Sequence, residues 1–481
     1  MQQIDKSIKL DAAHLEAVMP WGGANSTVGW VFRPNTLENL AAVFALARRK
    51  GVSVGLRGGG NSYGDAACNE GNIVLDLTRL TRILDWDPNM GVITVEPGVT
   101  LQQLWEYVLG DGWWPPVCTG TMHITIGGGA AMNVHGKNSF AVGTFGDHIK
   151  KFELMLPNGE IIECSRDENR DIFFAAIGGF GMLGCFTSLT LQMKRVYSGL
   201  LAVEAHASRN LAEMFQQIRD LIPTSNYIVG WVDCAAKGDA LGRGQIHLGN
   251  YLKKGEDRYP QRSLQISKQH LGDALFTFFP RSAMWRLMQP FFNQVGVPWI
   301  NLAKYWSAAL GSGHKMRQPH AQFHFLLNYF PDWQKSVGKG GLIQYQPFVP
   351  DDSAEATFTQ LLTLSQQAGL VPYLGVLKRH RPDPFLMTHG LDGWSIALDY
   401  RITEANRSRV VALCQQMDQI VIAAGGRFYP AKDSTLTPET ALAYLGADTL
   451  AQFRTLKKRC DPHEILQTNF WRRVFKKGNN N

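Results

Sequence analysis

The sequence contains no long hydrophobic run. No uninterrupted apolar stretch approaches the ~18 residues that a membrane-spanning helix needs. Residues 1–15, MQQIDKSIKLDAAHL, also lack the apolar core of a secretion signal. We therefore expect a soluble, cytoplasmic protein.

Cysteine is scarce and scattered. The seven cysteines form no CxxC pair, and their number is odd. Disulfide frameworks and zinc ribbons require paired or regularly spaced cysteines, so the pattern favours a reducing compartment and predicts no metal site. The cysteines occupy positions 68, 118, 164, 185, 234, 414 and 460.

A concentrated basic face is also missing. Lys and Arg number 48 against 41 Asp and Glu, a surplus of +7, and no Lys/Arg run exceeds three residues. Nucleic-acid binding usually requires a clustered basic surface, so the charge pattern argues against it. With 481 residues, of which 45% are hydrophobic and 19% charged, we expect two or three globular domains.

A glycine loop follows the first predicted helix and strand. Residues 37–50 form a capped amphipathic pattern that ends at Gly51, and residues 52–56 alternate like a strand. The loop at residues 57–65, RGGGNSYGD, lacks the Lys-Ser/Thr of a Walker P-loop. Consecutive glycines allow backbone N–H groups to converge on a phosphate. The loop alone leaves an anion site and a plain turn both open.

A second glycine-rich stretch spans residues 119–146. Gly127-Gly128-Gly129 followed by two alanines indicates that the backbone packs closely against something flat or bulky. The polar residues 135–138, HGKN, follow shortly after. Further on, residues 179–184 match G-x-G-x-x-G. A helical segment precedes this motif and a strand follows it, which is the reverse of a nicotinamide site, so we predict a tight turn there.

Together these motifs resemble the PCMH-type FAD-binding domain of the vanillyl-alcohol oxidase superfamily. The similarity is strongest to the decaprenylphosphoryl-ribose oxidase family, the flavin half of a two-enzyme sugar epimerase. It covers nearly the whole chain, because further family-like stretches follow in the right order. They are residues 341–346 (GLIQYQ), residues 393–394 (GW) and residues 426–434 (GRFYPAKDS).

The resemblance implies FAD as the cofactor and assigns site residues by position. The implied FAD contacts are Leu56, Arg57, Gly58, Gly59, Gly60, Asn61, Ser62, Tyr63, Gly64, Asp65, Ala66, Gly120, Thr125, Ile126, Gly127, Gly128, Met132, Asn133, Val134, His135, Phe186 and Tyr429. The implied substrate pocket contains Lys137, Trp231, Gln344, Gln346 and Lys378. Lys432 would lie over the flavin and face the substrate.

The chain departs from the family pattern in two respects. Members that attach FAD covalently often use a His in the first loop, where Asn61 stands, and a Cys where Thr121 stands. We therefore expect non-covalent FAD. The pocket Cys of the decaprenylphosphoryl-ribose oxidases is replaced by Ala397, and the segment RHRPDPFLMTH at residues 379–389 is unlike the family. Both changes concern the substrate rather than the cofactor.

The expected fold class is α+β. A two-subdomain PCMH-type FAD-binding domain is predicted at residues 1–198. An α+β substrate, or cap, domain with an antiparallel sheet follows at residues 199–424. Residues 425–481 would then return to the FAD-binding domain.

The expected function is oxidation of a secondary hydroxyl of a sugar or sugar-phosphate-like substrate to a ketone. FAD supplies the hydride acceptor, N5, and the protein must supply a base within hydrogen-bond reach of the hydroxyl. Lys432 could act as the base if burial lowers its pKa. His135 could act without such tuning, because the pKa of a free His is about 6.5. We assign substrate activation to Lys432 and support of the cofactor to His135.

Other readings stay open. They are an alditol or aldonolactone oxidase, a sterol-type double-bond reductase, and a protein that only binds flavin or carbohydrate. If the chain is the oxidative half of an epimerisation, an NAD(P)H-dependent reductase partner would complete it.

One aromatic segment is ambiguous. Residues 274–300 hold six Phe or Trp before Val295 and only two charges, Arg281 and Arg286. These side chains either pack the substrate domain or form a cover over the pocket that touches lipid headgroups. The second alternative would suit a lipid-linked substrate and peripheral membrane association.

Overall fold

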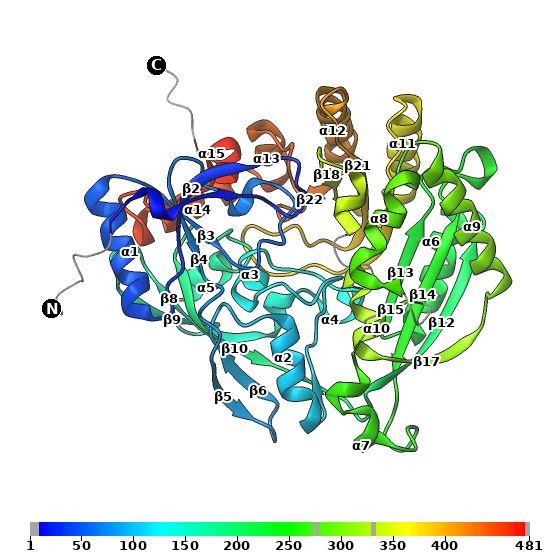
Figure 1. Ribbon diagram of the computed structural model, residues 1–481, viewed down its shortest axis with the longest axis horizontal. Helices are drawn as coiled ribbons and strands as arrows, with labels where there is room; N and C mark the ends of the chain where they lie inside the picture. Colours follow the sequence, from blue (N-terminus) through cyan, green and yellow to red (C-terminus); the bar gives the residue numbers. More distant parts are fainter. Residues whose placement is uncertain (1–8, 271–273, 276–278, 329–332, 477–481) are drawn as a thin grey trace.

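The structure is a computed structural model that describes residues 9–270, 274–275, 279–328 and 333–476. It is a mixed α and β fold, as the sequence predicts. Two lobes lie side by side (Figure 1), with the N-terminal sheets in one and a large antiparallel sheet in the other.

The first lobe begins with a four-stranded sheet in the order β1-β2-β4-β3. Helix α1 (Leu37–Lys50) packs on it, with Thr36 accepting from the Asn39 N–H at its start and Gly51 at φ 63° at its end. The helix predicted at residues 37–50 is therefore confirmed. The strands are β1 (Leu15–Val18), β2 (Thr27–Phe32), β3 (Val54–Arg57) and β4 (Ile73–Asp76).

A five-stranded antiparallel sheet in the order β5-β6-β10-β8-β9 completes the first lobe. The tight turn predicted at residues 179–184 connects helix α5 to strand β10, as expected. The strands are β5 (Ile83–Asp87), β6 (Val92–Val95), β8 (Ile149–Met155), β9 (Ile161–Ser165) and β10 (Cys185–Gln192). The helices are α2 (Leu101–Val108), α3 (Ile126–Ala131), α4 (Ser139–Val142) and α5 (Arg170–Ala176), and the short pair β7 (Trp113–Trp114) and β11 (Lys194–Arg195) lies beside them.

A nine-stranded sheet builds the second lobe. Its order is β17-β12-β14-β13-β20-β21-β19-β22, and β18 also pairs with β21. The strands are β12 (Leu200–Ser208), β13 (Tyr227–Val232), β14 (Gly244–Tyr251), β17 (Lys315–Pro319), β18 (Leu342–Tyr345), β19 (Pro347–Pro350), β20 (Gly375–His380), β21 (Gly393–Arg401) and β22 (Arg427–Phe428).

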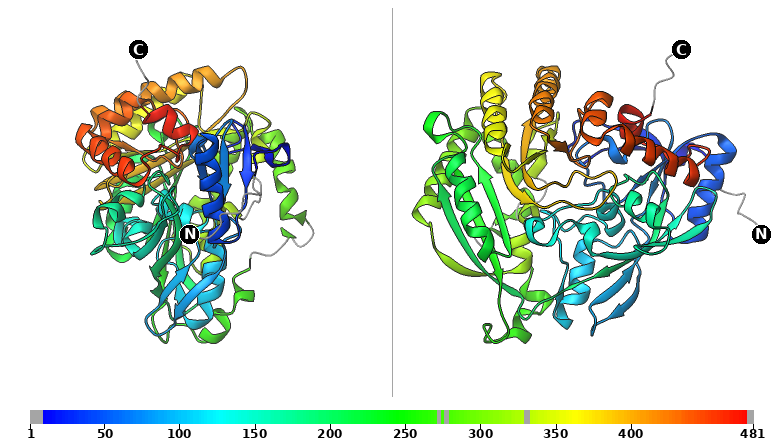
Figure 2. Two further views of the ribbon diagram at one scale, coloured as in Figure 1. Left: turned by 90° about the vertical axis from the view of Figure 1, so that its left-hand side faces the viewer. Right: turned by 180° about the vertical axis from the view of Figure 1, so that it is seen from behind.

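Helices cover both faces of this sheet. Helices α6 (Leu211–Leu221), α11 (Ala354–Gln367) and α12 (Arg407–Ala423) pack on one face, where Met214 of α6 lies against Gly230. Part of the other face carries α9 (Gly296–Leu310) and α10 (His320–His324), and the rest turns toward the first lobe (Figure 2). Smaller elements are α7 (Pro260–Ser263), α8 (Met284–Met288), β15 (Ala274–Leu275) and β16 (Phe279–Pro280).

The C-terminal helices return to the first lobe. They are α13 (Pro438–Leu445), α14 (Ala447–Cys460) and α15 (Asn469–Val474). The Val54 N–H donates to the Ile465 carbonyl at 2.7 Å, and the Gln467 N–H donates to the Val54 carbonyl at 3.0 Å. The glycine loop after β3 is thereby held by the end of the chain.

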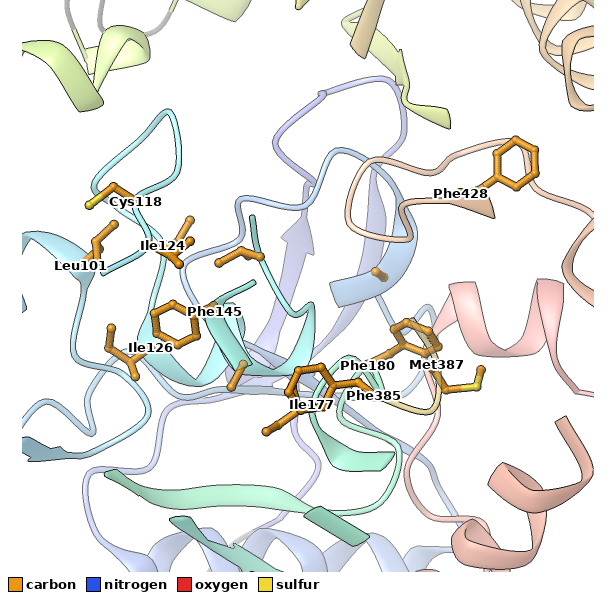
Figure 3. Close-up of a cluster of buried hydrophobic side chains, with 14 of the residues drawn as sticks. Leu101, Cys118, Ile124, Ile126, Phe145, Ile177, Phe180, Phe385, Met387 and Phe428 are labelled. Atoms are coloured by element: carbon orange, nitrogen blue, oxygen red, sulfur yellow. The ribbon is translucent and has the colours of Figure 1, made fainter. Parts of the chain in front are cut away.

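A shared hydrophobic core joins the two lobes beneath α3 (Figure 3). Phe385 and Met387 come from the connection between β20 and β21, and they lie beside Ile177 and Phe180 of the first lobe. The Leu386 N–H donates to the Phe174 carbonyl at 2.9 Å. The segment that is unlike the family in sequence is therefore a packed connection between the lobes.

The aromatic segment near α8 and α9 is partly exposed and partly packed. Phe291 is 58% exposed, Val295 72% and Trp299 68%, whereas Val297 is 3% exposed and Phe292 packs against a buried cluster. Both interpretations of residues 274–300 therefore stay open for the described part, while Phe276 and Phe278 lie outside the described residues. Within the described ranges, no helix is both long and apolar enough to cross a membrane.

Candidate active site

A cavity of about 930 Å³ separates the glycine loops of the first lobe from the nine-stranded sheet. This is near the upper end of the 300–1,000 Å³ typical of ligand pockets. Both lobes line it, so the site depends on how they pack.

The first glycine loop forms one wall. In the described part of the chain, the N–H groups of residues 58–62 have no recorded acceptor, so they are available to an anionic ligand. A Cβ at Gly58 would collide with the Thr125 hydroxyl, and one at Gly59 with the His123 carbonyl oxygen. Glycine is needed here because the two loops approach each other closely.

The second glycine segment forms the adjoining wall. Thr125 accepts from the Gly128 N–H at 3.3 Å and begins α3. A Cβ at Gly127 would lie 2.6 Å from Cβ of Pro97. The small residues therefore let α3 pack against the neighbouring loop while its other side faces the cavity.

Most residues that the sequence assigned to FAD line this cavity. They are Leu56, Gly58, Gly59, Gly60, Asn61, Ser62, Tyr63, Ala66, Gly120, Thr125, Gly127, Gly128, Met132, Val134, His135, Phe186 and Tyr429. The free N–H groups, the small residues and the volume suit a large phosphate-bearing cofactor such as FAD.

Five of the assigned residues do not line the cavity wall. They are Arg57, Gly64, Asp65, Ile126 and Asn133. Asp65 instead binds Arg473 at 2.8 Å, and Arg473 also binds Asp433 at 2.8 Å. This ion-pair bridge ties the first glycine loop to the GRFYPAKDS stretch near the C-terminus. Asn133, at φ 43°, accepts from the Gly146 N–H and donates to Asp383 of the connection between lobes.

The wall that the second lobe contributes follows from strand alternation. Residues directly opposite in an antiparallel pair share a face, and every second residue returns to it. Trp231 pairs with Val376, Val376 with Ala397, and Lys378 with Ser395. One face of the sheet therefore carries the cavity residues, and the predicted substrate residues Lys137, Trp231, Gln344, Gln346 and Lys378 all line the cavity, as does Ala397.

Four lysines from different segments line the cavity. Lys137 follows α3 in the chain, Lys304 lies on α9, Lys378 lies on β20, and Lys432 lies in the C-terminal stretch. Burial lowers the pKa of Lys137 to about 7 and that of Lys378 to about 8. Such lysines change charge close to neutral pH, so they can bind anions and also exchange protons there.

Lys432 has an unusual setting. Its Nζ lies 3.7 Å from the centroid of the Tyr63 ring, and burial lowers its pKa. The nearby Asp399 opposes this shift by favouring the charged amine, while Lys378 adds to it. Burial in turn raises the pKa of Asp399, whose Oδ1 accepts from the Gln344 amide at 2.5 Å. The lowered pKa is the condition under which the sequence interpretation allowed Lys432 to act as a base.

His135 differs from its expected titration. Burial lowers its pKa well below 6.5, and the charges of Lys378 and other neighbours add to this effect. The expectation that His135 titrates near 6.5 is therefore wrong. Its Nε2 lies 3.1 Å from the Gln346 amide nitrogen. A neutral imidazole suits an orienting role better than a role as a charged group.

Some cavity residues escaped the sequence interpretation. Lys304 of α9 lies 4.0 Å from the centroid of the Trp231 ring, and Gln245 and His247 of β14 lie on the same face as Trp231. The alternation along residues 244–251 could have found the last two. Asp399 could not have been found, because it pairs with Gln344 across strands β21 and β18, which are adjacent in the sheet but far apart in the sequence.

Comparisons with known proteins agree with this geometry. Residues 28–165 match the FAD binding domain family. The chain is 29% identical to decaprenylphosphoryl-beta-D-ribose oxidase of Mycolicibacterium smegmatis over 464 residues, which is 95% of this chain and 97% of that protein. It is 30% identical to L-gulonolactone oxidase of Bos taurus over 161 residues, 34% of this chain and 36% of that protein. A putative D-arabinono-1,4-lactone oxidase of Neurospora crassa is 24% identical over 48% of this chain and 41% of its own length.

Residues 28–165 thus match the FAD binding domain family, and the protein is an FAD-dependent oxidoreductase. The resemblance inferred from the motifs is confirmed, including the cofactor. The likeness to the decaprenylphosphoryl-beta-D-ribose oxidase extends through the second lobe, whereas the 161-residue likeness to the gulonolactone oxidase covers about a third of the chain.

Proposed function

We propose that the protein oxidises a secondary hydroxyl of a sugar or sugar-phosphate-like substrate to a ketone. The observation that carries the proposal is the placement of Lys432 on the cavity wall, in contact with Tyr63 of the FAD loop. A lysine whose pKa is lowered by burial can take the hydroxyl proton while remaining close to the cofactor.

The chemistry divides between cofactor and protein. FAD, when bound, supplies the acceptor for the hydride that leaves the C–OH carbon. The neutral amine of Lys432 takes the hydroxyl proton, so the C–O single bond becomes a carbonyl. Gln344 and Gln346 offer amide groups to the remaining hydroxyls, and Lys137 and Lys378 offer positive charge to an anionic substituent.

Charged side chains in the cavity favour this proposal over its alternatives. A sterol-type substrate has no anionic group to pair with buried amines, whereas Lys137, Lys378 and Lys432 all face this mostly apolar cavity. An alditol or aldonolactone oxidase would share the FAD lobe and differ in the second lobe. Relatives with lactone oxidase names match 34% and 48% of this chain, and a sugar oxidase matches 95%. This difference in coverage favours the sugar or sugar-phosphate reading.

FAD is proposed to bind without a covalent bond. The Asn61 amide donates to the carbonyls of Gly59 and His123, each at 3.0 Å, and offers no nucleophile. Thr121 stands at the second attachment position, and burial raises the pKa of the nearby Cys118 thiol. Neither position provides an activated nitrogen or sulfur.

A lipid-linked substrate and peripheral membrane association are also proposed. Val295, Trp299, Trp306 and Leu310 follow one another at helical spacing, and all are exposed. Ile300 of the same helix lines the cavity. An exposed apolar stripe next to a pocket is typical of surfaces that contact other molecules, and a lipid carrier would fit it. If the oxidation is half of an epimerisation, an NAD(P)H-dependent reductase would complete it.

The test is an anaerobic screen of the purified yellow protein. Sugars, sugar phosphates, alditols and aldonolactones are added in turn, and the flavin absorbance is followed. Loss of the band with a sugar or sugar phosphate supports the proposal. Loss with alditols or lactones alone would replace it with the oxidase alternative.

A further inference from the structure

Four buried side chains, those of His135, Gln346, Ser395 and His380, form a continuous hydrogen-bond network at the cavity wall. Nε2 of Gln346 lies 3.1 Å from Nε2 of His135 and 3.3 Å from Oγ of Ser395. Oγ of Ser395 lies 2.8 Å from Nε2 of His380. The exposed fractions of these four residues do not exceed 6%. His135 and Gln346 line the cavity, but Ser395 and His380 do not.

His135 and His380 of this network are both neutral. Burial lowers the pKa of each well below 6.5, and Lys378 adds to the effect on both. A neutral imidazole has one N–H donor and one bare nitrogen acceptor. The tautomer of His135 therefore depends on whether the group beside its Nε2 donates or accepts a hydrogen bond. That group is the Gln346 amide.

Two orientations of the Gln346 amide satisfy the contacts. In the first, its NH₂ donates to His135 and to Ser395, and Ser395 either donates its hydroxyl to His380 or accepts from the His380 Nε2–H. In the second, the amide is turned over: its oxygen accepts from the His135 Nε2–H and from the Ser395 hydroxyl, and Ser395 accepts from the His380 Nε2–H. Oxygen and nitrogen of an amide are interchangeable in shape, so the neighbours decide between the two.

The choice matters at the cavity. Gln346 has no recorded partner for its remaining amide atom among the described residues. The first arrangement leaves the oxygen as an acceptor for a ligand, and the second leaves the NH₂ as a donor. His135 changes in step, because its proton moves between Nδ1 and Nε2.

We propose that His380 and Ser395 are positioning residues that fix the Gln346 amide and the His135 tautomer in one arrangement. The cavity wall then presents a single donor and acceptor pattern to the substrate hydroxyls. The effect on substrate binding rests on the proposed sugar oxidation, whereas the His135 tautomer can be measured without any substrate.

The surroundings suit this role. Ser395 stands opposite Lys378 in the pairing of β20 and β21, which places His380 two residues further along the same face. The His380 ring packs 4.5 Å from that of Phe348 and 5.0 Å from that of His135. These contacts restrict rotation of the His380 ring, so its bond to Ser395 is held in place.

The experiment compares Ser395→Ala and His380→Phe with the wild-type holoenzyme. Nitrogen-15 NMR of labelled histidine reports the tautomer of His135, and steady-state kinetics with the substrate found in the screen reports kcat and KM. We expect one His135 tautomer in the wild type and a mixture in both variants. Loss of one neutral hydrogen bond should raise KM about three- to tenfold, with a smaller change in kcat. His380→Gln, which keeps a side-chain donor and acceptor, should restore much of the wild-type behaviour.

Ser365→Ala is the matched control. Ser365 is fully buried in the same lobe, and its hydroxyl lies 2.8 Å from that of Tyr400. It is not part of the network of His135, Gln346, Ser395 and His380. It should leave the tautomer and KM unchanged. An unchanged His135 tautomer in both Ser395→Ala and His380→Phe would overturn the inference. Failure of every sugar to reduce the flavin would overturn the proposed function instead, and the NMR result would stand separately.

Discussion

Lys432 and Tyr63 are in direct contact: the Lys432 Nζ lies 3.7 Å from the centroid of the Tyr63 ring. The two residues are far apart in sequence, one in the first glycine loop and the other near the C-terminus. The Tyr63 N–H also donates to the Ala431 carbonyl at 2.9 Å. The first glycine loop and the C-terminal stretch that carries Lys432 are therefore held together.

Replacing Lys432 should separate cofactor binding from chemistry. Lys432→Ala should keep FAD but lose ~10²–10⁴-fold in the rate of flavin reduction by substrate, because general-base contributions have this size. Single-turnover absorbance measurements under anaerobic conditions provide the rate. Lys150→Ala, which removes an exposed lysine of β8 away from the cavity, is the control and should reduce at nearly the wild-type rate. Equal rates for Lys432→Ala and wild type would exclude Lys432 as the base.

The flavin should leave the protein on denaturation. Asn61 and Thr121 cannot form the histidyl and cysteinyl bonds that attach FAD covalently in relatives with other residues there. Acid precipitation is therefore expected to leave the yellow colour in the supernatant. A washed pellet that remains yellow would contradict this expectation.

Substrate affinity should depend on pH if the substrate carries a phosphate. Lysines are charged below their pKa, and burial lowers the pKa values of Lys137 and Lys378 to about 7 and 8. As the pH rises through these values, the positive charge is lost and KM for a sugar phosphate should increase. An uncharged sugar should show little change. Lys378→Arg, which remains charged, should flatten the profile, and a pH-independent KM in the wild type would count against the anion role.

The exposed stripe on α9 should bind membranes. Trp299 and Trp306 are 68% and 58% exposed. Moving their apolar rings from water into a membrane interface is favourable. Co-sedimentation with anionic vesicles is expected for the wild type and should be lost in Trp299→Ser/Trp306→Ser. Tyr107→Ser, which removes another exposed aromatic residue on α2, should bind like the wild type. Wild-type protein that stays in the supernatant would argue against a membrane-facing surface.

Local sequence patterns predicted the local structure well. Thr36 and Gly51 mark the two ends of α1 through contacts within a few residues, so this helix could be predicted directly from the sequence. The glycine loops could also be predicted, because closely packed backbone segments require small residues and these are visible in the sequence.

Long-range pairings could not be read in the same way. Gln346 lies between strands β18 and β19 and turns toward His135. The low pKa of His135 arises from burial among residues of β20 and the connection after it. Likewise, the exposure of α9 depends on which face of the sheet it covers. Each of these features is decided by tertiary packing, which no local pattern contains.

The most direct test of the central claim is the isotope effect on flavin reduction. The substrate from the screen is labelled with deuterium at the carbon that bears the reacting hydroxyl, and reduction is followed in a single turnover at saturating concentration without oxygen. Removal of a hydride from that carbon predicts clearly slower bleaching with the deuterated compound. A flavin that stays oxidised with all carbohydrates, or that is reduced only by a nicotinamide cofactor, would contradict the account.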